Sequence, residues 1–518
     1  MGFLGAGLLL YEPAMTGPFL SDDLHYVENN AYVHTLSSRN LLTILDPFGQ
    51  STLAVVNYSP VQLLIHAVAW SVFGSETTGH HVVNVLFHVL ASLLLIPLFI
   101  RSGVHPIGAI FGGVVFLVHP ANVEAVAWIS QLKSSSALTL SLAALLVFPK
   151  RRALGTVLFV LALLAKPTAA FALPVAALLS WTQDEQISWR WLAVWLLAFL
   201  VFSFVELSVH QRSGAAAGPL YATPFALVMT IGALAARYLL MASTSLGVSA
   251  FHEPRPIESF FDPWWLGSLP ALALLGWRLI ATWRGRQPEV AFWVWALVSF
   301  APVSQIFPFL YPLADRYLYF ILPGLLGGAL LAGQGAALYF WPDSDTRRRV
   351  AWVGIALGVV LCGAFAAHAH SRARIWRFSA TLAADAARHY PDGVSASLIR
   401  ARNAAQSGDA AVAAVALQAA VDRGFNQFAQ IYGDPAYDPV RNDPRFRAIV
   451  DGMAAGWIQK VAGRKDPTQG ELRMAALAHI ARREYDAARQ MLTRALELGD
   501  AYDEEIRADL DRLARMPH

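Results

Sequence analysis

Apolar residues fill most of the first 370 positions, in blocks separated by short polar breaks, whereas from Ser371 onward they recur at helical spacing among Ala, Arg, Asp and Glu. A helix that spans a bilayer needs about 20 apolar residues. This pattern predicts an all-α protein, with about 11 transmembrane helices in residues 1–370 and a soluble helical domain in residues 371–518. The predicted spans are a short one at the N-terminus, within residues 1–11, and blocks near 80–101, 105–120, 124–148, 155–166, 168–182, 189–208, 264–283, 289–306, 316–340 and 350–370.

Several segments depart from this simple pattern. Residues 1–11 also fit a degenerate signal peptide, although no cleavage signal stands out after them. The breaks at His119-Pro120 and Lys166-Pro167 predict short helices joined by tight turns, which membranes tolerate where the turn lines a polar cavity. Blocks 53–74 and 222–243 are apolar but carry polar residues, so we expect them to lie at the membrane interface rather than to span.

The distribution of basic residues predicts the orientation, because Lys and Arg favour cytoplasmic loops. Under the predicted count the outer, periplasmic side holds loops 12–79 and 209–263, the segment 307–315 and the whole C-terminal domain. The basic residues that then share the cytoplasmic side are Arg101, Lys150, Arg151, Arg152, Arg190, Arg284, Arg286, Arg347, Arg348 and Arg349.

The C-terminal domain contains an internal repeat, because residues 396–424 and 471–499 match at a constant offset. Small residues at this spacing let neighbouring helices stack closely, as in tetratricopeptide repeats, so we predict a tetratricopeptide-like α-solenoid. A generic Ala-rich bundle is the alternative. The equivalent positions are Ala401 and Ala476, Ala413 and Ala488, Leu417 and Leu492, Ala420 and Ala495, and Gly424 and Gly499.

Composition and charge exclude several classes of protein. The chain is 56% hydrophobic and only 14% charged, with a mean hydropathy of +0.45, which excludes an ordinary soluble protein. The net charge is +3 and no long basic run occurs, so nucleic acid is not an expected partner. A single cysteine, Cys362, excludes an internal disulfide and a cysteine-rich metal site.

The acidic pair Asp22-Asp23 opens the first outer loop. One interpretation is a helix N-cap in a solvated loop. The other is a general base, because a carboxylate can take a proton from an acceptor hydroxyl. Two carboxylates alone are a weak signal for a divalent metal, so we expect no metal site, although a metal is not excluded.

Polar residues within apolar segments form a second group of candidates. His81, Asn84 and His88 share one helical face and would either be buried core residues or line a cavity. His119 and Glu124 sit at a turn between two short spans, where a buried carboxylate without a function would be costly. We therefore expect these residues to line a substrate cavity.

Cations near the outer ends of the helices complete the candidate site. Lys133 and Lys166 interrupt apolar runs and either snorkel or meet an anion. Arg316 has a planar fork that suits phosphate oxygens. Its neighbours Asp315 and Tyr317 are expected to line the substrate cavity. With Arg237 these cations would converge on one polyanion beside an acidic base, which is the arrangement expected for group transfer from a phosphate leaving group.

Four motifs in order resemble the bacterial relatives of the transmembrane and tetratricopeptide-repeat O-mannosyltransferases, over nearly the whole chain. Each motif alone is weak. Family members often carry Glu-Arg-Lys where this chain has Gln131-Leu132-Lys133, so only the lysine is retained here. The motifs are GHHVVNVLFH from Gly79 to His88, HPANVEAVAW from His119 to Trp128, LLAKP from Leu163 to Pro167 and ADRYLY from Ala314 to Tyr319.

The resemblance implies a GT-C fold and a glycosyltransferase in the bacterial inner membrane. It implies a polyprenyl-phosphate sugar donor, with mannose the first expectation, and inverting, metal-independent transfer to an acceptor hydroxyl. Asp22 or Asp23 would be the base and Arg316 a phosphate contact. The repeat domain favours a protein acceptor, while the donor sugar and the acceptor do not follow from the motifs.

Three other functions fit parts of the sequence. A transferase of the same fold could modify a lipid or a polysaccharide instead of a protein. A lipid or ion transporter would use intramembrane His, Glu and Lys, but it predicts inverted repeats that the sequence does not display. A membrane-anchored repeat scaffold would leave the intramembrane polar residues unexplained.

Overall fold

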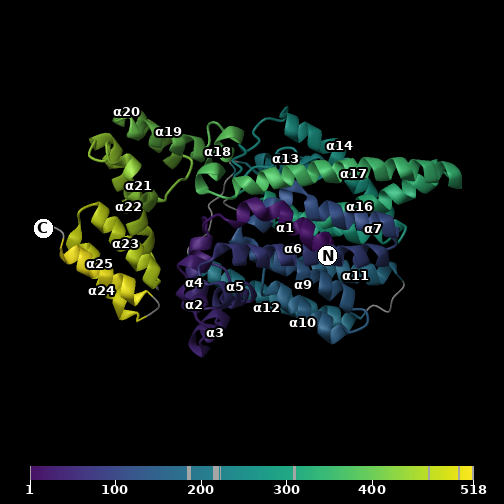
Figure 1. Cartoon of the computed structure of the whole chain (residues 1–518), viewed down its shortest axis with the longest axis horizontal. Helices are drawn as coiled ribbons and strands as arrows, with labels where there is room; N and C mark the ends of the chain where they lie inside the picture. The colour runs from purple at the N-terminus through teal and green to yellow at the C-terminus, as the bar shows by residue number, and fades with distance from the viewer. Residues whose placement is uncertain are drawn as a thin grey trace.

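The computed structural model describes residues 2–183, 188–213, 221, 223–306, 311–464, 467–499 and 502–515, and these ranges contain helices and no strand. Parts of two predicted outer segments, 214–220 and 307–310, lie outside the described residues. Figure 1 shows a large bundle of helices beside an arc of shorter helices at the C-terminus. The bundle corresponds to the apolar region and the arc to the predicted soluble domain.

Within the described ranges, six helices are long and apolar enough to cross a membrane. The bent pair formed by α7 (Pro106–Val118) and Pro120–Ala127 would be a seventh if it counts as one span. The chain is therefore a multi-pass membrane protein by the length and composition of its helices. The six are α6 (Thr77–Arg101), α12 (Trp189–Ser213), α13 (Pro224–Thr244), α14 (Pro263–Arg284), α16 (Asp315–Phe340) and α17 (Ser344–Ile375).

The predicted count of about 11 spans is not confirmed, because five of the predicted spans besides α7 form helices of only 11 to 16 residues. Such helices rise about 17–24 Å, less than the ~30 Å hydrocarbon core. Length alone therefore does not qualify them as spans. They are α1 (Gly2–Met15), α9 (Leu132–Val147), α10 (Arg152–Leu163), α11 (Ala172–Thr182) and α15 (Glu289–Phe300).

The continuous span predicted over 124–148 is wrong. The chain forms α8 (Val123–Ala127), a 3₁₀ turn at Ile129–Gln131 and then α9. The Asn84 side-chain amide donates to the carbonyls of Val126 at 2.9 Å and Trp128 at 3.1 Å, and so satisfies acceptors that a continuing helix would use. A tertiary contact therefore ends α8.

The two predicted breaks before proline are present. His119 and Lys166 both have extended backbone conformations, with ψ of 126° and 135°. The proline ring disfavours the helical conformation of the residue before it, which explains both breaks. Each is followed by a 3₁₀ turn, Pro120–Asn122 and Pro167–Phe171.

The two blocks predicted to lie at the interface differ in the structure. Block 53–74 contains the end of α4 (Gln50–Val55) and α5 (Pro60–Phe73), which is too short to span. Block 222–243 forms α13, which is long enough to cross a bilayer. The segment after α13 runs back along this helix, since the Ile257 N–H donates to the Thr230 hydroxyl at 3.0 Å. The position of α13 at the membrane interface stays a prediction.

Helices α15 and α16 approach each other closely at Gly324. A Cβ atom at this position would lie 2.6 Å from the Ala296 backbone nitrogen and 2.7 Å from the Phe292 carbonyl oxygen. Only glycine allows this contact. The close packing holds the α16 end that carries Arg316 against the centre of the bundle.

The internal repeat appears as two helix pairs. Helices α19 (Val394–Gln406) and α20 (Ala410–Val421) recur 75 positions later as α23 (Gln469–Ala481) and α24 (Tyr485–Glu497). The matched alanines are fully buried, and Gly424 and Gly499 have left-handed φ of 94° and 60°. The other tail helices are α18 (Ser379–His389), α21 (Phe428–Gly433), α22 (Pro444–Ala462) and α25 (Asp503–Ala514).

Two loops of the membrane part form hydrogen bonds with the tail. The Glu253 carboxylate accepts the Val394 N–H at 2.9 Å, and the Tyr502 hydroxyl donates to the Asn29 carbonyl at 2.7 Å. The first contact lies in the loop after α13 and the second in the loop that follows the acidic pair. The two ends of the tail are therefore both held close to the candidate site.

Candidate functional site

The acidic pair follows α1, and its two carboxylates have different environments. Asp23 is 2% exposed and accepts the backbone N–H groups of Leu20 at 3.0 Å and Ser130 at 2.6 Å. It makes no side-chain bond that caps the following helical turn, so the N-cap interpretation does not hold for Asp23. Asp23 instead fastens the first loop to the 3₁₀ turn before Lys133.

Asp22 is partly exposed, and its charge acts on both Arg316 and Tyr311. Burial raises the pKa of Tyr311; the Arg316 charge opposes this rise and the Asp22 charge adds to it. Asp22 therefore lies within electrostatic range of an arginine 294 positions away in sequence, in the first turn of α16. Of the two carboxylates, Asp22 is the one that solvent and a substrate can reach.

Burial also changes the protonation of Asp23. Desolvation raises the pKa of its carboxyl from 3.8 to about 7, although the hydrogen bonds from Leu20 and Ser130 act in the opposite direction. A buried carboxylate loses solvation that two hydrogen bonds only partly replace. Asp23 therefore takes up a proton more readily than an ordinary aspartate.

Glu124 and Arg316 form a buried ion pair. One Glu124 oxygen accepts the Arg316 backbone N–H at 2.7 Å, and the other accepts its guanidinium. The guanidinium also lies over the rings of Tyr317, Tyr311 and Trp128, at 4.9, 5.5 and 5.5 Å from their centroids. Arg316 is thus fixed in orientation by a carboxylate and three aromatic rings.

Two lysines complete a cationic group with Arg316. The Lys166 ammonium donates to the Ser134 hydroxyl at 2.7 Å, and Lys133 donates to the Tyr26 hydroxyl at 3.2 Å. The charges of Lys133, Arg316 and Glu124 all act on Lys166. The structure therefore brings three predicted cations within electrostatic range of one another, and the charge of Asp22 acts on one of them, Arg316.

Arg237 does not join this group through any described contact. Its guanidinium stacks on the Trp264 ring at 4.2 Å, and the groups whose charges act on it are Tyr390 and Asp262. Asp315 also faces away from the three cations, since its carboxylate accepts from His252 at 2.7 Å and from the Ser249 N–H at 3.0 Å.

The polar face of α6 contacts the helix breaks. Asn84 bonds the end of α8, and His88 lies 3.1 Å from the Leu117 carbonyl and 3.0 Å from the Tyr319 hydroxyl. His119 accepts the Ala121 N–H and lies 3.2 Å from the Ala242 carbonyl. His81 is buried close to the Ala127 carbonyl without a hydrogen bond of normal geometry. These contacts give Asn84, His88 and His119 a structural role in supporting the site.

Sequence reasoning missed four residues that the structure brings to the site or its support. Tyr26, Ser134 and Tyr311 contact the three cations, and His252 contacts Asp315. Tyr26 lies four positions after Asp22, and Ser134 directly follows Lys133. Their closeness in sequence to predicted site residues was the one signal that could have identified them. No comparable signal marks His252.

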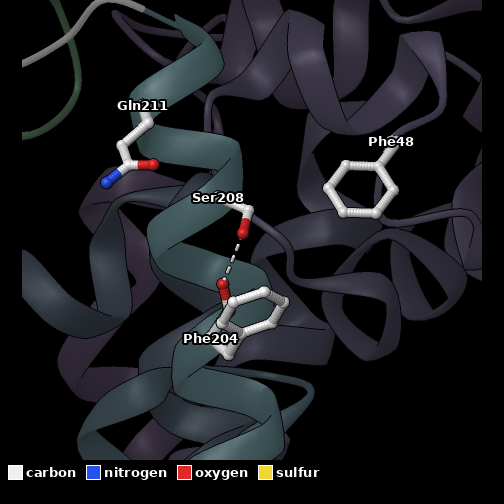
Figure 2. A pocket seen from close by; sticks show the side chains of 4 residues that line it. All are labelled: Phe48, Phe204, Ser208 and Gln211. Carbon is white, nitrogen blue, oxygen red and sulfur yellow. Dashed lines mark hydrogen bonds between the residues drawn. The ribbon is translucent and has the colours of Figure 1, made fainter.

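A cavity of about 450 Å³ lies beside the C-terminal half of α12, lined by Phe48, Phe204, Ser208 and Gln211. Figure 2 shows Phe48 facing the helix across this space and the Ser208 hydroxyl donating to the Phe204 carbonyl, at 2.8 Å. None of the predicted site residues lines it. Among the residues that the structure describes, no three His, Cys, Asp or Glu side chains are grouped to hold a metal ion.

Comparison with known proteins points to one class of enzyme. No family model matches the chain. The chain is 26% identical over 184 residues to the protein O-mannosyl-transferase F38B6.6 of Caenorhabditis elegans, a match that covers 33% of this chain. The match spans about a quarter of that relative, 26% of its length. This distant similarity supports a relation to the protein O-mannosyl-transferases and suggests a glycosyltransferase.

Proposed function

We propose that this chain is a glycosyltransferase that moves a sugar from a polyprenyl-phosphate donor to a hydroxyl group of a protein, with inversion, on the outer face of a bacterial inner membrane. Mannose is the first candidate for the sugar. The observation that carries the proposal is the partly exposed Asp22, whose charge acts on Arg316, together with the cationic group that Arg316 forms with Lys166 and Lys133. The distant relation to an O-mannosyl-transferase supports the same reaction class.

Asp22 is the proposed general base. Its carboxylate takes the proton of a Ser or Thr hydroxyl while that oxygen attacks the anomeric carbon of the sugar. Asp23 is engaged by two backbone N–H groups, so it holds the first loop in place rather than meeting the acceptor. In this proposal Asp22 acts on the acceptor, and Asp23 positions the loop that carries Asp22.

The cationic group is the proposed binding site of the donor phosphate. The bond between the anomeric carbon and the phosphate oxygen breaks as the acceptor oxygen bonds from the opposite face, and the electron pair leaves with the polyprenyl phosphate. A group of basic side chains suits the negative charge of a phosphodiester donor, because charge-assisted hydrogen bonds to phosphate oxygens are strong. Fixed cations at the leaving oxygen stabilise charge that develops in the transition state.

The tail is the proposed binding site of the protein acceptor. Stacked helix pairs of this kind present an extended surface on which a polypeptide can lie. The contact between Tyr502 and Asn29 holds the tail at the loop of the acidic pair, so an acceptor bound there would be close to Asp22. We place this domain in the periplasm.

Transfer of radiolabelled mannose from polyprenyl-phosphate mannose to periplasmic proteins, in membranes that contain the chain, tests the proposal. Asp22→Asn should lower transfer roughly 10²–10⁴-fold, the usual contribution of a general base. Asp23→Asn, at equal protein level, should lower it less. Full transfer by the double variant Asp22→Asn, Asp23→Asn would contradict the role of the pair.

A further inference from the structure

Asp315 and His252 form a buried contact that the proposed reaction does not use. Their side chains are 4% and 2% exposed, and the His252 Nε2 atom lies 2.7 Å from the Asp315 Oδ1 atom. The other oxygen of Asp315 accepts the Ser249 N–H at 3.0 Å. The first residue of α16, directly before Arg316, is therefore held by the loop after α13.

The second ring nitrogen of His252 reaches the tail. Its Nδ1 atom lies 3.1 Å from the hydroxyl of Tyr390, which follows α18. A neutral His252 with its proton on Nε2 satisfies both bonds, because it donates to Asp315 and accepts from Tyr390. Asp315, His252 and Tyr390 thus form one continuous chain of hydrogen bonds.

A second contact ties the same loop to the tail. The Asp385 carboxylate of α18 accepts the Ala250 N–H at 2.8 Å and pairs with Arg372, the two bonds being 2.6 and 2.9 Å long. The loop around His252 therefore lies between α16 and α18, with a buried polar contact on each side. Buried polar networks of this kind keep a single geometry only when every member is satisfied.

We propose that His252 and Tyr390 are positioning residues, which couple docking of the tail to the placement of Arg316 through Asp315. When the tail is docked, Tyr390 orients His252, and His252 holds the carboxylate at the start of α16. Arg316 then points its guanidinium at Glu124 and at the donor phosphate. The effect on catalysis rests on the proposed function, whereas the structural coupling does not.

Hydrogen–deuterium exchange of the purified full chain tests the coupling without any activity measurement. Tyr390→Phe removes only one hydroxyl group, and His252→Ala removes both hydrogen bonds. Both should speed exchange in the first turn of α16, around Arg316, with the larger effect for His252→Ala. The control is Arg255→Ala, which breaks an exposed pair with Asp392 across the same loop and tail and should leave that exchange unchanged.

The same variants are then assayed for transfer. Because small displacements of a catalytic group are costly, kcat should fall roughly 10–100-fold in His252→Ala, with the acceptor KM unchanged. His252→Gln can still donate to Asp315, so it should keep more activity than His252→Ala. A general structural defect would instead lower all variants equally, Arg255→Ala included.

Two results would overturn the proposal. One is unchanged exchange around Arg316 in both Tyr390→Phe and His252→Ala. The other is an equal effect of Arg255→Ala, which would assign the coupling to tail docking in general and not to His252. Absence of transfer by the wild-type chain would contradict the proposed function alone, since the exchange measurement would still decide the coupling.

Discussion

The Glu124 carboxylate holds Arg316 from two directions, with one oxygen on its backbone N–H at 2.7 Å and the other on its guanidinium. The two residues are 192 positions apart. Their contact joins the first turn of α8 to the first turn of α16. An arginine held in this way presents its remaining N–H groups in a fixed direction, as recognition of a phosphate requires.

Glu124→Gln should destabilise the protein strongly. Loss of one partner leaves Arg316 as a buried charge without compensation, which costs roughly 3–5 kcal/mol. The free energy of unfolding in detergent micelles measures the effect. Asp392→Asn is the control, because the Arg255–Asp392 pair is 75% exposed on both sides and should contribute almost nothing. Equal effects of the two substitutions would argue against the buried pair.

Asp23 should make stability depend on pH. The folded-state pKa of about 7 lies above the unfolded value of 3.8, so the folded protein binds this proton more tightly than the unfolded chain. The contribution of Asp23 is therefore most favourable below pH 3.8, and stability should decline as pH rises through the folded pKa. Unfolding of the wild type and of Asp23→Asn across this window measures the effect, and an identical slope in both would contradict it.

Lys166→Gln should raise the KM for the donor roughly 10–100-fold, because a hydrogen bond to a charged group contributes about 1.5–3 kcal/mol. Steady-state kinetics with varied polyprenyl-phosphate sugar measures this change. Arg237→Gln is the matched control, since Arg237 stacks on Trp264 outside the cationic group and its loss should leave the donor KM unchanged. A larger effect of Arg237→Gln would move the phosphate site towards α13.

Ala413→Leu should destabilise the tail by roughly 1–3 kcal/mol, the usual cost of overpacking a filled core. Ala413 lies on α20 and is fully buried in the core of the tail, whereas Ala411, on the same helix, is exposed. Ala411→Leu is therefore the matched control and should have little effect. Limited proteolysis of the tail in the full chain reports both, and equal cleavage would contradict the packing of the repeat.

Much of the architecture could be predicted because it depends on local spacing. Helical periodicity, the breaks before Pro120 and Pro167, and the repeat that relates α19–α20 to α23–α24 all follow from residues close together in the chain. Cations in apolar surroundings were also predictable, because an unpaired charge there is costly wherever it lies. This reasoning identified Lys133, Lys166 and Arg316.

Other features depended on partners far away in sequence. The length of α8 depends on Asn84, and the placement of Asp315 depends on His252, so neither could be derived from local pattern. Arg237 has the same chemistry as Arg316, but its neighbour is an aromatic ring of α14 rather than a carboxylate of α8. Residue type therefore gave no means to tell the two arginines apart.

The acidic pair shows the same division within two adjacent residues. The positions of Asp22 and Asp23 in the first loop of an apolar helical protein with a repeated tail follow from the order of residues alone. Folding adds that Asp23 turns inward to the backbone of Leu20 and Ser130, while Asp22 stays partly exposed and its charge acts on Arg316. The physical reason is that solvation and hydrogen bonding differ between the two carboxylates, and both depend on segments that only folding brings together.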